Sequence, residues 1–471
     1  MRRTVRGRFL LGAESPNVSL TRTPPVAPKI VVENTRSRLT PKCGVWPERR
    51  TTKEKGRSML QVVHERCAGL DVHKKTVVAC VLVTRQDGQV EQFKHTFGTT
   101  TGELVALADW LTGYAISSLA MESTGVYWIP VYNLLEERFK CVVVNAQHMK
   151  AVPGRKTDLS DAEWIAQLHR HGLLKGSFIP PKPQRHLREL VRHRTNVVER
   201  RSQSVNEVQK VLETGNIKLA SVVSEITGVS AMEMLGGLVE GDKDPKALAE
   251  LARGRLRDKT RQLEAALTGR LEKHHRFILS QLLAEISFCE EQIMELDIRI
   301  AAEMKEYQEL LDRLDEIPGV NQRIAQVLVA EVGVDMTRFG DAAHLVSWAG
   351  MCPGNNQSGG KRRTSRVRQG NKSLKRVLVE AAHAAGRKKD SYFSAQYRRV
   401  ATRRGKKRAK VAVGRSILET TFHMIQRGSA YKDLGADYFD RRDPEKLAKR
   451  LAERITRLGY KVSYVTATQP A

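Results

Sequence analysis

Short apolar runs alternate with segments of helical spacing between residues 63 and 175. Runs rich in β-branched residues and bounded by polar turns are typical of strands, whereas apolar residues three and four apart are typical of helices. The predicted strands are residues 67–73, 76–83, 90–97, 116–122 and 141–145. Helices are predicted over 101–111 and 127–138, and a further one includes 156–166. This order predicts an α/β domain over residues 63–175.

Residues 176–314 are expected to be helical, because apolar residues recur there at steps of three and four. The clearest seam has one stutter and consists of Leu282, Ile286, Cys289, Ile293, Leu296, Ile300, Met304, Tyr307, Leu311 and Leu314. A long antiparallel helix pair within the chain and a coiled coil between chains both satisfy such a seam. We favour a role in assembly for this coiled-coil region.

The composition favours a polyanionic partner. Lys and Arg total 80 against 52 Asp and Glu, a formal net charge of +28. The length of 471 residues suggests about three domains. The six cysteines lie far apart without a C-x-x-C pair, so we expect reduced thiols in a cytosolic protein. Because no long apolar run occurs, no membrane span is expected.

The two ends of the chain differ from the rest. Residues 1–58 contain 14 Lys and Arg against 4 Asp and Glu and show no hydrophobic periodicity. Such a segment is predicted to be a disordered basic extension, and Met59 is a plausible true start. Residues 431–471 are expected to form a C-terminal tail.

Four acidic residues carry the most chemistry. Asp71 interrupts an apolar run, Glu122 ends another, and Asp158 and Asp161 are three apart, a spacing that places both on one face of a helix. Clustered carboxylates repel one another, and about two divalent cations would neutralise them while bridging a phosphodiester. The set predicts a nuclease or strand-transfer site that binds Mg²⁺, with Mn²⁺ as a substitute.

Each acid also has a plainer interpretation, and Asp71 and Glu122 could simply be turn and strand-end residues. Asp158 could cap a helix, Ser160 with Glu163 fits a capping box, and Asp161 would favour the helix dipole. The order of the set, a strand Asp, a strand-end Glu and a helix with Asp-x-x-Asp, nevertheless suits a ribonuclease-H-like (RuvC-like) fold.

A third informative region surrounds Ser358, which Gly359 and Gly360 follow. A phosphate could approach its hydroxyl closely, although a simple turn explains the bare pattern as well. The residues that follow are rich in Lys and Arg and contain no Asp or Glu, and such a density of positive charge neutralises phosphates. The predicted nucleic-acid-binding residues are Lys361, Arg362, Arg363, Arg366, Arg368, Lys372, Lys375 and Arg376.

Residues 317–333 resemble a helix-hairpin-helix element, in which a Gly-containing turn offers N–H groups to a phosphate. A simple helix start after Pro318-Gly319 is the alternative.

Four motifs in order resemble the DEDD transposases of the bacterial insertion-sequence 110 family. They are Gly69-Leu-Asp-Val-His-Lys74, Met121-Glu-Ser-Thr-Gly125, Lys156-Thr-Asp-Leu-Ser-Asp-Ala162 and Ala349-Gly-Met-Cys-Pro-Gly354 with Gln357-Ser-Gly359. The resemblance runs from about residue 63 to 428, and Cys352, where Thr or Ala is expected, is a small departure.

The resemblance implies an RNA-guided recombinase that excises and inserts its own element. It implies that Asp71, Glu122, Asp158 and Asp161 bind Mg²⁺ and that Ser358 attacks DNA. It also implies a mostly helical C-terminal transposase domain over 315–430, a non-coding guide RNA, and composite sites in a homodimer or homotetramer acting on the bacterial nucleoid.

Two other classes remain open on the residues alone. A RuvC-like junction-resolving endonuclease would need the acids but would use water as its nucleophile, making Ser358 dispensable. A nucleic-acid-binding assembly protein would need only the basic segments and the heptads. Covalent attachment to DNA separates the recombinase from the first class, and any cleavage excludes the second.

Overall fold

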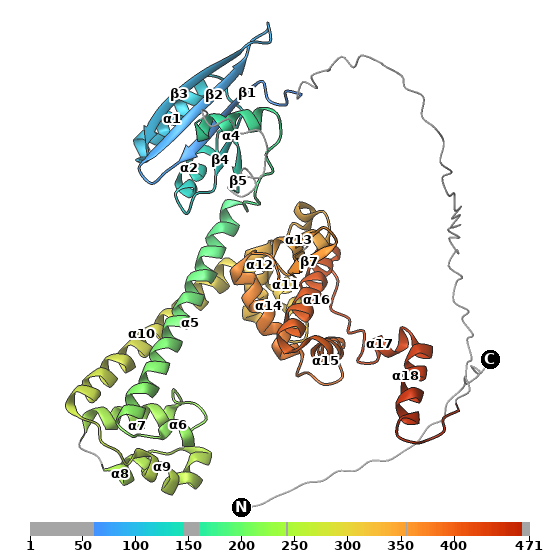
Figure 1. Ribbon diagram of the computed structural model, residues 1–471. Coiled ribbons are helices and arrows are strands. Elements are labelled where there is room, and N and C mark those ends of the chain that lie inside the picture. The colour runs from blue at the N-terminus through green and yellow to red at the C-terminus, as the bar shows by residue number, and fades with distance from the viewer. Residues whose placement is uncertain (1–60, 146–159, 242–243, 355, 365, 464–471) are drawn as a thin grey trace, which may run out of the picture.

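The computed structural model describes residues 61–145, 160–241, 244–354, 356–364 and 366–463 (Figure 1). The apolar side chains of these residues form three main cores. The predicted extension over 1–58 lies outside the described residues.

The first core belongs to a mixed sheet of order β3-β2-β1-β4-β5. Its strands are β1 (Arg66–Val72), β2 (Thr76–Thr84), β3 (Val90–Gly98), β4 (Ser118–Glu122) and β5 (Lys140–Val144). The β1–β2 and β2–β3 pairs are antiparallel, whereas β1–β4 and β4–β5 are parallel. All five predicted strands are confirmed, and the topology is compatible with a ribonuclease-H-like fold.

Helices cover both faces of this sheet. Side chains of α1 (Thr101–Gly113) and α2 (Trp128–Leu135) share a core with Ala68, Leu70 and Val72 of β1. The alternate residue Cys67 packs instead with α4 (Asp161–Arg170) on the opposite face. Because both faces of β1 are covered, its sequence is apolar at almost every position. Asp71 is therefore an exception that packing does not explain.

Two long helices form the middle of the molecule. α5 (Lys182–Thr214) and α10 (Lys273–Glu303) run side by side (Figure 1). Arg194 binds Asp297 and Arg201 binds Glu290, so seven residues forward on α5 match seven residues backward on α10. The pair is antiparallel, which is the first of the two arrangements that the heptads allowed. A coiled coil between chains is not needed to bury this part of the seam.

The helical pair carries its own small core at the far end. That core is built by α6 (Leu219–Val222), α7 (Val229–Glu240), α8 (Pro245–Glu250), η1 (Gly254–Lys259) and α9 (Thr260–Leu267). The heptad seam does not stay in one helix, because α10 ends at Glu303 and Leu311 and Leu314 lie on α11.

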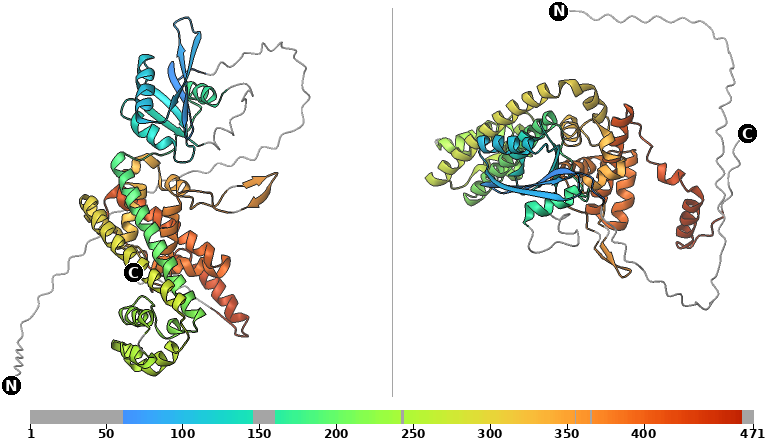
Figure 2. Two further views of the ribbon diagram at one scale, coloured as in Figure 1. Left: turned by 90° about the vertical axis from the view of Figure 1, so that its left-hand side faces the viewer. Right: turned by 90° about the horizontal axis from the view of Figure 1, so that it is seen from above.

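The third core is helical and follows η2 (Lys305–Tyr307). Its elements are α11 (Gln308–Asp315), α12 (Gln322–Val332), η3 (Met336–Phe339), α13 (Ala342–Trp348), α14 (Lys372–Ala385), α15 (Tyr392–Arg404) and α16 (Lys406–Arg427). A hairpin of β6 (Asn356–Ser358) and β7 (Lys361–Thr364) projects from it (Figure 2). The chain continues through α17 (Tyr438–Arg441) and α18 (Pro444–Thr456). Among the described residues, no helix is both long and apolar enough to cross a bilayer.

Candidate functional site

Two of the predicted acids lie at the carboxyl ends of the adjacent strands β1 and β4. We call this end of the sheet the acidic edge. In the parallel β1–β4 pair, Leu70 lies opposite Met121, so Asp71 and Glu122 are the next residues on adjacent strands. Each is two residues beyond a residue that faces α4: Asp71 follows Gly69, and Glu122 follows Ala120. Because side chains alternate along a strand, both carboxylates lie on the α4 side of the sheet.

The sequence brings α4 unusually close to this edge. A Cβ atom at Gly69 would lie 2.3 Å from the carbonyl oxygen of Ala162 and 2.3 Å from the backbone nitrogen of Ala166. Only a glycine therefore allows the helix backbone to rest on β1. Since Asp161 is the first residue of α4, this close approach places its backbone at the end of the sheet that carries Asp71. Asp158 lies outside the described residues.

Neighbouring charges are arranged around this edge. The Oδ2 atom of Asp71 lies 3.1 Å from Nε2 of His73, and the Asp71 side chain is 16% exposed. Glu163 pairs with Lys94 of β3. The predicted capping box is wrong, because Ser160 is the N-cap of α4 but its side chain accepts no capping hydrogen bond.

The donor set has the chemistry that Mg²⁺ prefers, since Asp71, Glu122 and Asp161 all offer carboxylate oxygens. Asp71 is only slightly exposed, Glu122 is partly buried, and Asp161 is exposed, so the edge is open to solvent on one side. Within the described part of the chain, no three His, Cys, Asp or Glu residues are close enough to hold one ion. The residues present suit the metal in kind.

Ser358 lies far along the chain, on the β6–β7 hairpin. It ends β6 and lies opposite Lys361, with Gly359 and Gly360 forming the turn between them at φ values of +56° and +74°. Two consecutive residues with positive φ are what a tight hairpin turn requires, so the turn interpretation of the glycines is confirmed. Ideal Cβ atoms at both glycines would meet nothing within 4 Å, so the tip is open to an approaching ligand.

The base of the hairpin is tightly built. Pro353 and Val367 form a bridge, and the N–H of Gly354 donates to the carbonyl of Arg366 over 2.8 Å. Next to it the backbone at Gly350 crosses that at Gly370 so closely that a Cβ at Gly350 would lie 2.9 Å from the Gly370 nitrogen.

The predicted nucleic-acid-binding residues follow the return path of the chain. Lys361, Arg362 and Arg363 belong to β7, and Arg366 and Arg368 are exposed beyond it. Lys372, Lys375 and Arg376 lie in the first turns of α14, where Arg376 pairs with Glu199 of α5. Lys and Arg residues therefore follow one another along the backbone from β7 to the start of α14, which contacts α5 through Arg376.

The helix-hairpin-helix interpretation of residues 317–333 is not favoured. Pro318 is buried, and a Cβ at Gly319 would lie 2.2 Å from the carbonyl oxygen of Ala381. The turn packs against α14 rather than facing a ligand. The alternative holds instead, because the Asn321 side chain caps α12 by accepting from the N–H of Ile324 over 2.9 Å.

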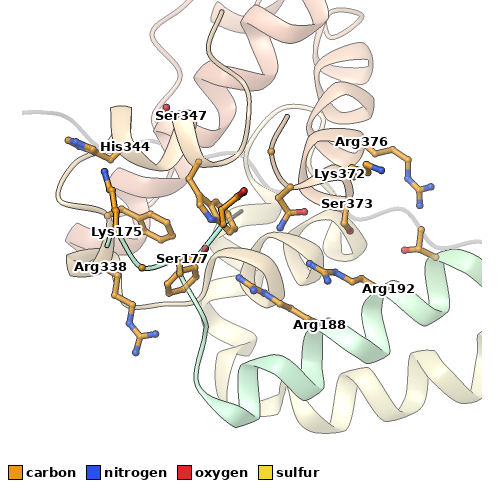
Figure 3. A pocket seen from close by; sticks show the side chains of 18 of the residues that line it. Lys175, Ser177, Arg188, Arg192, Arg338, His344, Ser347, Lys372, Ser373 and Arg376 are labelled. Atoms are coloured by element: carbon orange, nitrogen blue, oxygen red, sulfur yellow. The ribbon is translucent and has the colours of Figure 1, made fainter. Parts of the chain in front are cut away.

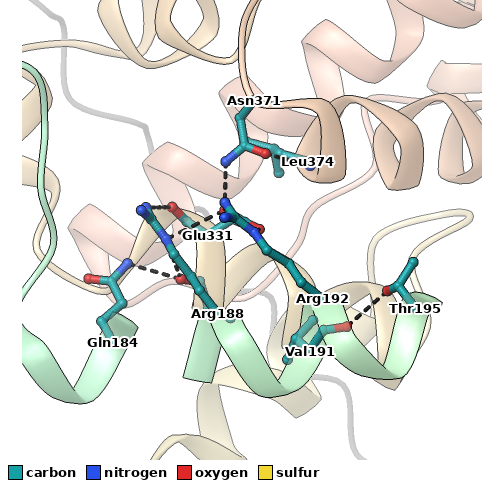
Figure 4. Close-up of polar contacts among 9 residues, drawn as sticks. Gln184, Arg188, Val191, Arg192, Thr195, Glu331, Asn371 and Leu374 are labelled. Carbon is teal, nitrogen blue, oxygen red and sulfur yellow. Dashed lines mark hydrogen bonds and ion pairs between the residues drawn. The ribbon is translucent and has the colours of Figure 1, made fainter. Parts of the chain in front are cut away.

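Sequence reasoning missed a buried charge network that joins α5 to the C-terminal core (Figure 4). Glu331 of α12 is fully buried and accepts two hydrogen bonds from Arg192, of 2.7 and 2.8 Å. Asn371 donates to the same carboxylate over 2.6 Å while its Oδ1 caps α14. Arg188 donates to the carbonyl of Ala330 over 3.1 Å. A signal was present, since Glu331 interrupts an apolar run just as Asp71 does.

The network changes the pKa values of Arg192 and Arg188 in opposite directions. Its hydrogen bonds with Glu331 raise the pKa of Arg192, whereas burial, with a contribution from nearby Arg192, lowers the pKa of Arg188 to about 10. Both guanidinium groups therefore stay charged at neutral pH. Arg185, one turn earlier on α5, donates to Asn133 over 3.1 Å and pairs with Glu136 at the end of α2.

Comparison with known proteins supports one family over two segments. A family described as "Transposase", with DEDD and IS110 in its name, matches residues 68–217, which include Asp71, Glu122, Asp158 and Asp161. A second, described as "Transposase IS116/IS110/IS902 family", matches residues 311–398, which include Ser358.

A curated relative agrees with these matches. The "Insertion element IS110 uncharacterized 43.6 kDa protein" of Streptomyces coelicolor is 31% identical over 159 residues, 33% of this chain. The chain spans 38% of the length of that relative. The two family matches lie in the expected order and together cover about half of the 471 residues. The chain belongs to the IS110 family of transposases.

Proposed function

We propose that this protein is a DNA transposase, a site-specific recombinase that excises and inserts its own insertion sequence. The observation that carries the proposal is the placement of Asp71 and Glu122 on adjacent strand ends, beneath the helix that begins at Asp161. Asp71 interrupts an apolar strand that is covered on both faces, so packing alone does not account for a carboxylate at this position. A polyanionic substrate fits the formal net charge of +28.

The acidic edge would hold the divalent cations, with Asp71, Glu122, Asp158 and Asp161 as ligands. Mg²⁺ is the proposed ion, two per site, and Mn²⁺ is expected to substitute. When bound, such ions polarise the scissile phosphate and neutralise charge that develops on its oxygens. The β1–β4 register and the contact between Gly69 and α4 support positions for Asp71, Glu122 and Asp161 at the same end of the sheet.

Ser358 is the proposed nucleophile. Its hydroxyl would lose a proton as its oxygen bonds to the scissile phosphorus, the bond from phosphorus to the leaving sugar oxygen would break, and that oxygen would take up a proton. The phosphoserine bond keeps the energy of the phosphodiester, so the reverse attack by a sugar hydroxyl rejoins DNA without a nucleotide cofactor. The open Gly-Gly tip and the cations that follow it support this role.

Two partners belong to the same proposal. The family resemblance suggests a guide RNA encoded by the element, and the excess of Lys and Arg is consistent with such a partner. A homodimer or homotetramer would form composite sites, in which the serine of one copy meets the acids of another. The projecting hairpin in Figure 2 suits this arrangement. The protein would act on the bacterial nucleoid.

A trapping experiment with a nicked DNA substrate tests the nucleophile. Wild-type protein should become covalently attached, and protease digestion with mass spectrometry should find the nucleotide adduct on the peptide that contains Ser358. The Ser358→Ala variant should bind nucleic acid but neither cleave nor join. The matched control is Ser365→Ala, which changes the neighbouring serine of the same basic segment. An adduct on Ser365, or wild-type cleavage by Ser358→Ala, would overturn the assignment and favour a nuclease that uses water.

A further inference from the structure

A large cleft separates the sheet domain from the C-terminal core. Its volume is about 1260 Å³, and its walls come from the end of β5, the 175–178 linker, α5, α13 and the start of α14 (Figure 3). Pockets for small ligands occupy roughly 300–1,000 Å³. This cleft therefore has room for a short stretch of a polymer rather than for one small metabolite.

Aromatic rings line one wall. Trp348 and Phe178 meet edge to face with centroids 5.7 Å apart, and the buried Phe339 supports both rings. The Arg188 guanidinium lies 5.5 Å from the Phe178 centroid and 5.8 Å from that of Trp348. Trp348 and Phe178 keep part of their surface open and border the cleft. Such a wall can stack a nucleobase whose faces are free, whereas base pairs in a duplex keep their faces covered.

The remaining lining is cationic. Lys175, Arg188, Arg192, Arg338, Lys372 and Arg376 all border the cleft. Three carboxylates, those of Glu199, Glu331 and Asp335, pair with these groups. Neither Lys175 nor Lys372 forms an ion pair with any residue that the structure describes, so positive charge is left over for a ligand. In Figure 3, Arg188 and Arg192 extend from α5 toward the start of α14, which carries Lys372 and Arg376.

The cleft also lies between the two halves of the proposed active site. Asn145 on its wall directly follows β5, whose Val144 lies opposite Glu122. On the other side, Trp348 and Gly370 flank the crossing from which the Ser358 hairpin emerges. A strand that runs from the acidic edge to the hairpin would pass through the cleft.

We propose that this cleft binds an unpaired nucleotide of a nucleic-acid strand, with its base stacked on Trp348, whose ring Phe178 supports edge to face, and with its phosphates held by Lys175 and Lys372. The strand is DNA at a recombining end or an unpaired loop of an RNA partner. The inference rests on the proposed function for the identity of the strand. The recognition itself rests on rings and charges that are independent of any catalysis.

The first test is photocrosslinking of the full chain in an Asp71→Asn background, in which cleavage is blocked. Oligonucleotides carry 5-iodouracil in an unpaired segment or in a duplex, once as DNA and once as RNA. Digestion and mass spectrometry should find crosslinks from the unpaired probes on the peptides that contain Phe178 or Trp348. DNA and RNA arms identify the source of the strand. The absence of such crosslinks in both arms would overturn the proposal.

Fluorescence anisotropy supplies the second measurement. Trp348→Leu should weaken binding of a single-stranded oligonucleotide by about tenfold and that of a blunt duplex much less, since stacking on an aromatic ring contributes on this scale. Lys372→Glu should weaken single-strand binding without unfolding the protein, because an acid is well tolerated in the first turn of a helix. Lys210→Ala, an exposed change on α5 away from the cleft, is the control and should stay within about twofold.

These outcomes distinguish the nucleotide-binding cleft from the proposed recombinase function. Wild-type single-strand affinity in both Trp348→Leu and Lys372→Glu would reject the cleft even if recombination proceeds. Crosslinks at Trp348 in a wild-type protein that never cleaves or joins DNA would support the cleft and reject the proposed function.

Discussion

At the scale of single residues, Asp71 is the clearest test of the acidic edge. Asp71→Asn removes a negative charge but keeps the size and shape of the side chain, so the fold should keep its stability. Cleavage should fall by more than the roughly 10–100-fold that loss of a partner supporting a metal ligand costs. A DNA cleavage assay with Mg²⁺, together with thermal unfolding, measures both effects. Mn²⁺ should restore activity to wild-type protein after chelation, and Ca²⁺ should do so poorly.

The control is Asp109→Asn, which changes an exposed carboxylate of α1 that pairs with Arg138 in the same domain. It should leave cleavage unchanged. Full activity of Asp71→Asn, or wild-type activity in excess chelator, would contradict the metal site.

His169 makes the stability of the sheet domain depend on pH. Burial, with a smaller contribution from the stacked His64, lowers the pKa of His169 from 6.5 to about 4, and its Nε2 lies 2.9 Å from the hydroxyl of Ser118. Below pH 6.5 His169 takes up a proton in the unfolded chain, whereas in the folded chain it stays neutral down to a pH of about 4. Stability should therefore fall between pH 6.5 and about 4, by on the order of 3 kcal/mol in total.

Urea unfolding across this pH range measures the effect. In His169→Gln, which cannot titrate, the decline should be smaller than in wild type. Parallel pH profiles for the two proteins would show that His169 is not the titrating group.

At the scale of elements, the contact between α4 and β1 depends on one missing methyl group. Gly69→Ala would place a carbon 2.3 Å from the backbone of Ala162 and Ala166, so the helix must move away. Overpacking of this kind costs about 1–3 kcal/mol. Cleavage should fall further than DNA binding does, because Asp161 moves with the helix. Chemical denaturation and paired cleavage and binding assays measure these losses.

Gly102→Ala is the matched control in the same domain. A Cβ there meets nothing within 4 Å on α1, and alanine favours a helix over glycine by roughly 0.5–1 kcal/mol. It should be neutral or slightly stabilising. Equal effects of the two alanines would mean that α4 does not need the close contact.

The elements of the sheet domain could be predicted well from the sequence. β-branched runs such as 76–83 have few alternatives to a strand, and β2 indeed spans Thr76–Thr84. The placement of Asp71 and Glu122 at strand ends also followed from apolar runs that a carboxylate interrupts. Their shared edge depends on the β1–β4 register, which pairs strands separated by β2, β3 and α1 and which no local pattern encodes.

Other features escaped because they depend on distant partners. The heptad pattern does not predict which helix pairs with α10, because an apolar seam can pack against any helix with a complementary apolar face. Glu331 gave a signal in the sequence, but the cations that bind it lie about 140 residues earlier on α5. The sequence did not predict that the turn at Gly319 packs against α14, because α14 lies some 60 residues later in the chain.

At the scale of the whole molecule, the family resemblance predicts a bound guide RNA, and the formal net charge of +28 is consistent with such a partner. Protein purified from cells that contain the full element should carry a discrete RNA encoded beside its gene. Changing the loops of that RNA should redirect the DNA target in a recombination assay. The same protein expressed without the flanking DNA is the control and should not recombine. Unchanged recombination by nuclease-treated protein alone would refute the guide.

The first turns of α5 contact both neighbouring bodies, through Arg185 to α2 and through Arg192 to Glu331 on α12. The whole helix has 33 residues, about 50 Å, and its other end carries the small core. Over that length a tilt of about 6° displaces one end by about 5 Å, roughly one helical turn. Because both contacts lie near the same end of α5, a change in the tilt of this helix would act on the sheet domain and on the C-terminal core together.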